Sequence, residues 1–128
     1  MAGTNTWTCY GYTFPDSFFR DRGTLNKQGT RTTGCGYGLT QWTYWSRKKS
    51  LYEFVRANNA SDIGDINIQL RYLCEKELPE SYPALVEYLK TATDLAEATH
   101  KFHIEYERSA SIESVIRIKY AYECYSYL

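Results

Sequence analysis

The residues best suited to chemistry lie in one stretch, Thr32–Trp45, which reads TTGCGYGLTQWTYW. Three of its residues are glycines, and glycine adopts positive φ and admits the close approach of a ligand or of another backbone. Gln41 and Trp42 follow directly, so we expect an amide and aromatic rings in one place. Such a set suits a groove the size of a sugar or a base. The simpler alternative is a turn followed by core aromatics, because buried tryptophan is common.

Length and charge limit the classes of function. A chain of 128 residues indicates one domain with a real core. Fifteen basic and fifteen acidic residues give a net charge of zero, which argues against nucleic acid or an anionic membrane as partner. The thirteen tyrosines suit a wet recognition surface, or equally the half-buried positions of a small core. No apolar run approaches the roughly 20 residues of a membrane span, and the N-terminus has no secretory pattern.

The cysteines and histidines give a weak case for a metal. The four cysteines show no CxxC pair: Cys9, Cys35, Cys74 and Cys124. We expect free thiols in a reducing cytoplasm, with a Cys9–Cys35 disulfide as the alternative outside the cell. His100 and His103 lie one helical turn apart, which could hold a metal, but we expect an exposed helix face instead. The sequence therefore predicts neither a metal nor a cofactor.

The elements that must position these residues differ between the two ends of the chain. Residues 1–33 are rich in threonine, glycine and aromatics and form a predicted irregular segment, with a short hairpin around Trp7–Tyr12. Residues 34–128 form a predicted helical domain, and the fold class is all-α. Apolar periodicity and capping residues predict about five helices, starting near Ser46, Asp62 or Asp65, Ser81, Thr93 or Asp94, and Ser111, the second of them ending at Leu78–Pro79.

Four motifs resemble those of one known family. The run Tyr37-Gly38-Leu39-Thr40-Gln41-Trp42, followed by Arg47 and Leu51, resembles the "YGLxQW…R…L" signature of phage tail lysozymes. The segments Gln69–Leu78 and Ala98–Arg108 are similar to the family's "QLxYL…EL" and "A…F…YER" helices, and Arg117 and Ala121 match its closing "R…A". The resemblance covers roughly residues 34–122.

The resemblance implies a lysozyme-like helical fold and a function at the bacterial wall. Members are modules of phage tail tips that cleave the β-1,4 link between the amino sugars of peptidoglycan. The resemblance implies a glycan site in which Tyr37 and Trp42 stack on sugar, Gln41 hydrogen-bonds to it and Arg47 lies at the rim. The expected partner is therefore a peptidoglycan glycan strand, and the expected location is the virion tail or the host cytoplasm.

The chain departs from the family at the residue that does the chemistry. Members carry a glutamate, on a helix before the glycine turn, that protonates the leaving oxygen. Here no glutamate precedes Glu53, and the upstream acids are Asp16 and Asp21. We therefore assign no catalytic residue, and Asp16 or Asp21 is the candidate for any residual hydrolysis. Three explanations follow: a piece of a longer lysozyme, a degenerate lysozyme that binds glycan, or a phage protein that has recruited the fold to bind and inhibit a host protein.

Overall fold

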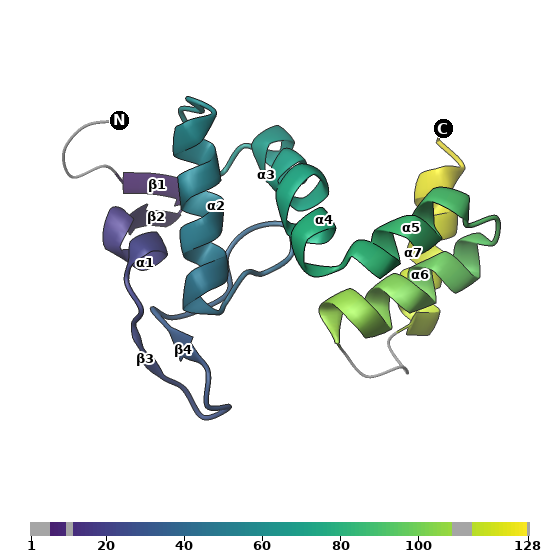
Figure 1. Cartoon of the computed structure of the whole chain (residues 1–128), viewed down its shortest axis with the longest axis horizontal. Helices are drawn as coiled ribbons and strands as arrows, with labels where there is room; N and C mark the ends of the chain where they lie inside the picture. The colour runs from purple at the N-terminus through teal and green to yellow at the C-terminus, as the bar shows by residue number, and fades with distance from the viewer. Residues whose placement is uncertain (1–5, 10–11, 109–113, 128) are drawn as a thin grey trace. The chain divides into compact units, whose positions relative to one another are not determined.

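The structure is a computed structural model that describes residues 6–9, 12–108 and 114–127, with side chains at 14–108 and 115–127 (Figure 1). It consists of two compact units, Met1–Lys76 (unit 1) and Glu77–Leu128 (unit 2). The division thus falls after residue 76, whereas the sequence suggested a boundary after residue 33. In the part of the chain that the structure describes, no helix is long and apolar enough to cross a membrane.

Unit 1 begins with two small hairpins around a short helix. Strands β1 (Thr6–Cys9) and β2 (Tyr12–Pro15) pair antiparallel, with Trp7 opposite Phe14, at the place where a hairpin was expected. Helix α1 (Asp16–Arg20) follows, and then strands β3 (Thr24–Leu25) and β4 (Arg31–Thr32) pair antiparallel.

The long helices of unit 1 follow the glycine turn. Helix α2 (Trp45–Ala57) packs against α1 and against α3 (Ile66–Tyr72), which continues through a π-helical turn, η1 (Leu73–Glu77). Asp65, one of the two predicted candidates, caps α3, because its Oδ1 accepts from Asn67 N at 2.7 Å. The prediction that Ser46 caps α2 is wrong, because the helix begins at Trp45, after Tyr44, and no side chain caps it.

Unit 2 is helical. Its elements are α4 (Leu78–Ser81), α5 (Pro83–Thr91), α6 (Leu95–Phe102), a second π-helical turn η2 (His103–Glu107) and α7 (Ser114–Tyr125). Asp94 caps α6, as one of the two predicted candidates, by accepting from Glu97 N at 3.1 Å. The expected helix end at Leu78–Pro79 is wrong, since helical backbone continues from η1 through Glu77 into α4, which contains Pro79 near its start. The predicted cap at Ser111 lies outside the described residues. A mostly helical chain is thus confirmed.

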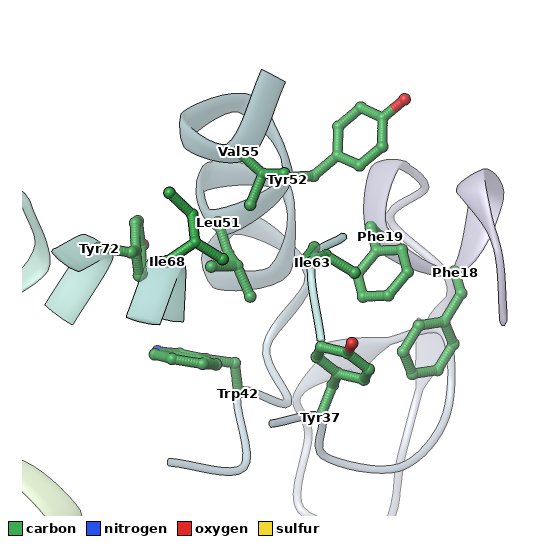
Figure 2. Packing of buried hydrophobic residues seen from close by; sticks show 10 residues of the cluster. All are labelled: Phe18, Phe19, Tyr37, Trp42, Leu51, Tyr52, Val55, Ile63, Ile68 and Tyr72. Atoms are coloured by element: carbon green, nitrogen blue, oxygen red, sulfur yellow. The ribbon is translucent and has the colours of Figure 1, made fainter. Parts of the chain in front are cut away.

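The core of unit 1 joins the N-terminal segment to the helices. Phe18 and Phe19 from α1 pack with the glycine-turn aromatics and with the inner face of α2, as Figure 2 shows. The ring centroids of Phe19 and Tyr37 lie 4.8 Å apart, edge to face. Ten residues make up this cluster: Phe18, Phe19, Tyr37, Trp42, Leu51, Tyr52, Val55, Ile63, Ile68 and Tyr72.

One cation lies among these apolar residues. Lys48, on α2, is fully buried, and its Nζ donates to the hydroxyls of Thr32 at 3.3 Å and Thr33 at 3.4 Å. The same Nζ lies 3.9 Å from the centroid of the Phe18 ring, in cation–π contact. Burial lowers the pKa of the Lys48 ammonium from 10.5 to about 8, and the electrostatic interaction with Cys35 opposes that shift.

Substitution of Trp42 tests whether the aromatic residues of the glycine turn belong to the core. Because its ring is fully enclosed, we expect Trp42→Ala to lower the free energy of unfolding by about 3–5 kcal/mol through lost burial and a cavity. Tyr44→Ala, at a neighbouring side chain that is 43% exposed, is the matched control and should cost less than about 1 kcal/mol. Urea unfolding followed by circular dichroism measures both. If both variants lost the same small amount of unfolding free energy, the assignment of Trp42 to the core would be contradicted.

The lowered pKa of Lys48 predicts that the stability of the protein depends on pH. Between the folded pKa of about 8 and the unfolded value of 10.5, the unfolded chain binds one more proton than the folded chain. The free energy of unfolding should therefore rise with pH in this range, by at most about 1.4 kcal/mol per pH unit. Because tyrosines also titrate at high pH, the measurement is the difference between wild type and Lys48→Met, from urea unfolding at pH 7.5–9.5. A difference that stays constant with pH would refute this account.

Candidate functional site

A groove of about 710 Å³ runs between α1 and the β3–β4 hairpin of unit 1. Its lining combines apolar surface with hydroxyls, an amide and a carboxylate. The lining residues are Pro15, Ser17, Phe18, Asp21, Gly23, Thr24, Asn26, Thr32, Thr33 and Gly34. This mixture is typical of pockets in which apolar contact supplies the area and a few polar groups orient the ligand.

Helix α1 supplies one wall of the groove. Phe18 faces the core, whereas Ser17 and Asp21 are exposed. Asp21 is the C-cap of α1, and its backbone N–H donates to Ser17 O at 3.0 Å, so the backbones of these two residues are held together. The helix therefore presents a hydroxyl and a carboxylate at the edge of the groove.

The β3–β4 hairpin supplies the opposite wall, and Asn26 fixes its loop. Asn26 Oδ1 accepts from Gln28 N at 3.0 Å and from Thr30 N at 2.9 Å, which is the local pattern that makes asparagine a turn residue. Gly23 lets the two strands approach, because a Cβ there would lie 1.9 Å from Thr32 O. The hairpin is thus shaped by particular side chains.

The wall nearest the core is a hydrogen-bonded network. The Thr33 hydroxyl donates to Phe18 O, which ties the strand to α1, and the Thr32 hydroxyl donates to Gly34 O at 2.9 Å. Both hydroxyls also accept from the buried Lys48 ammonium. Lys48 thus holds the groove wall from the core side, through its bonds to the two threonines. Its side chain is inaccessible to solvent, and its pKa is lowered.

Asp16, the other upstream acid, lies outside the groove lining. Its Oδ2 accepts from the Tyr52 hydroxyl at 3.1 Å, and that hydroxyl accepts from Arg56 Nη1 at 3.0 Å. The carboxylate is half-buried and joins the start of α1 to α2. Its contacts are those of a group that holds two helices together.

The glycine turn brings the expected residues together but turns the rings inward. Tyr37 and Trp42 pair across the turn, through Tyr37 N to Trp42 O at 3.0 Å and Trp42 N to Tyr37 O at 2.9 Å. Their side chains are 2% and 0% exposed. The expectation that they stack on sugar is therefore corrected: an enclosed ring offers no face to a ligand, and the core-aromatic alternative describes them.

Gln41 and Arg47 keep access to solvent. Gln41 is exposed and has a φ of 55°, and its Nε2 donates to Gly38 O at 2.8 Å, which closes the turn. Arg47 is half-buried in the first turn of α2. Neither residue is among those that line the groove. Nothing in the sequence singled out Ser17, Thr24 and Asn26, because scattered polar residues in an irregular segment carry no spacing signal.

The histidines and cysteines form no metal centre in the described part of the chain. His100 is exposed as expected, but His103 is 1% exposed, so the expectation of a shared exposed face is wrong for it. Cys35, Cys74 and Cys124 are exposed free thiols. The side chain of Cys9 lies outside the described residues.

The sequence profile of phage tail lysozymes matches residues 18–128, which include the end of α1, most of the groove lining, the glycine turn and all of unit 2. Searches of curated proteins and of solved structures gave no match. The profile match covers well over half of the chain, and it agrees with the motifs at the glycine turn and on the later helices. The chain therefore belongs to the phage tail lysozyme family.

Proposed function

We propose that this protein binds the glycan strands of peptidoglycan in the groove between α1 and the β3–β4 hairpin, and that it binds them without cleaving them. The observation that carries the proposal is the groove lining itself, in which the exposed Pro15 lies beside the hydroxyls of Ser17 and Thr24 and the carboxylate of Asp21. Apolar surface suits the face of a pyranose ring, and a carboxylate accepts hydrogen bonds from sugar hydroxyls.

Residues outside the groove extend the proposed contact. Gln41 Nε2 is used by its own turn, so Oε1 is the atom through which Gln41 would accept from a hydroxyl or an acetamido N–H. Arg47 would lie at the rim of the bound strand. Tyr37 and Trp42 would contribute indirectly, by holding the turn that carries Gln41. As a phage tail lysozyme, the protein is proposed to act at the tail of the virion.

The carboxylates favour binding over cleavage. Glycoside hydrolysis uses an acid in a semi-apolar enclosure together with a second carboxylate or a held water. Asp21 reaches the groove but is exposed, and Asp16 Oδ2 is engaged by Tyr52. Among the residues that line the groove, Asp21 alone carries a carboxylate. The lining therefore offers an acceptor for sugar hydroxyls but no pair of acids.

Binding is tested by co-sedimentation with purified, insoluble peptidoglycan. Wild type should bind, and Ser17→Ala/Asp21→Asn should bind about tenfold more weakly, because two hydrogen-bonding groups of the groove are lost. Glu53→Gln, an exposed acid of the same unit outside the groove, is the control and should bind as wild type does. Failure of the wild type to sediment would reject the proposal and favour the alternative, a host-protein partner.

Cleavage is tested on the same material by release of reducing ends. We expect no release above that of a buffer blank from wild type over hours, because the groove lacks an enclosed proton donor. If ends are released, Asp21→Asn and Asp16→Asn separate the two candidate acids, and the variant that loses release identifies the donor. Release by wild type would overturn the non-cleaving part of the proposal while leaving glycan binding intact.

A further inference from the structure

Unit 2 contains a groove of its own, formed by the end of α5, the start of α6 and the last turns of α7. Its volume is about 680 Å³, close to that of the groove in unit 1. In Figure 1 these three helices lie together in the green and yellow part of the chain. The lining residues are Leu89, Ala92, Thr93, Asp94, Leu95, Ala98, Tyr122 and Tyr125.

Two tyrosines on α7 line this groove and remain open to solvent. Tyr122 and Tyr125 are 54% and 63% exposed, although both lie on a helix that packs against α6. They are three residues apart, so they share one face of the helix at a spacing of roughly 5–6 Å. Two rings on one face of a helix can contact neighbouring sugars of one strand.

The other lining residues supply apolar surface and a hydrogen-bond acceptor. Leu89, Leu95 and Ala98 are half-buried and add apolar surface to the lining. Thr93 and Asp94 are exposed at the start of α6, and Asp94 Oδ1 is held in place by Glu97 N. A fixed carboxylate and a hydroxyl beside two aromatic rings can accept from sugar hydroxyls while the rings cover the apolar face.

We propose that this groove is a second, non-catalytic binding site for a sugar strand, in which Tyr122 and Tyr125 stack on successive pyranose rings and Asp94 accepts from their hydroxyls. The inference rests on the proposed function, because it takes the same polymer as ligand. It adds a site in the other unit, built from residues that the glycine-turn motif does not include. Two sites on one chain strengthen attachment to a polymer, since binding at one raises the local concentration at the other.

The chemistry of the lining favours the sugars over other components of the wall or of the cell. No lysine or arginine is among the lining residues, so the groove lacks the cations that phosphates or the carboxylates of stem peptides require. Tyrosine rings with a carboxylate suit a neutral, hydroxyl-rich ligand. The ligand is therefore the polysaccharide and not the attached peptide.

The test compares two pairs of tyrosines on α7 and in the turn that follows it. Tyr122→Ala/Tyr125→Ala removes the rings of the groove, and Tyr120→Ala/Tyr127→Ala removes two rings that are 58% and 89% exposed and lie outside its lining. Tyr122→Phe/Tyr125→Phe keeps the rings. The ligand is peptidoglycan from which an amidase has removed the stem peptides, and the dissociation constant comes from depletion of full-length protein. Thermal unfolding confirms that all variants are folded.

We expect the groove pair of alanines to weaken binding by about tenfold, as loss of a stacking platform does, and the phenylalanine pair and the outer pair to stay within about twofold of wild type. If wild type binds and the groove pair binds equally well, this second site is refuted while the proposed function stands. An equal loss in the outer pair also refutes it. If wild type does not bind the stripped glycan, the proposed function fails and this inference fails with it.

Discussion

The arrangement of unit 1 depends on the two hydrogen bonds made by the side-chain amide of Gln69. Its Oε1 accepts from Leu39 N at 2.8 Å, and its Nε2 donates to Ile63 O at 2.8 Å, in a position that is 3% exposed. A buried amide that is satisfied at both ends joins α3, the loop before it and the glycine turn. Gly38 makes the contact feasible, because a Cβ there would lie 2.7 Å from Gln69 Oε1.

The hydrogen bond between Leu39 and Gln69 joins two of the family motifs in the structure. The turn carrying Gly38 and Trp42 rests on the helix carrying Gln69 and Tyr72, and the Trp42 and Tyr72 rings meet edge to face with centroids 5.5 Å apart. The motif that suggested a sugar site is thus a packing motif. Its rings are part of the core, and the proposed ligand contact therefore lies at the groove built by α1 and the β3–β4 hairpin.

The two grooves use different means to place polar groups on apolar surface. In unit 1 a buried cation, Lys48, holds the hydroxyls of Thr32 and Thr33 in position, so the wall depends on an ammonium that burial makes less basic. In unit 2 the rings of Tyr122 and Tyr125 project from a helix, and the capping role of Asp94 fixes the acceptor. We therefore expect the first arrangement to respond to pH, whereas the second depends on helix packing.

Local sequence determined a good part of the protein. Apolar periodicity predicted the helical character of the chain, and capping residues located the starts of α3 and α6, since Asp65 and Asp94 accept from backbone N–H groups two or three residues away. The four motifs indicated the family, which the profile match confirms. Tertiary structure alone decided which aromatic rings are enclosed and which polar side chains share a groove. The burial of Trp42 and the presence of Asp21 and Thr33 in one groove depend on chain segments packing across the fold, and residue spacing carries no record of that packing.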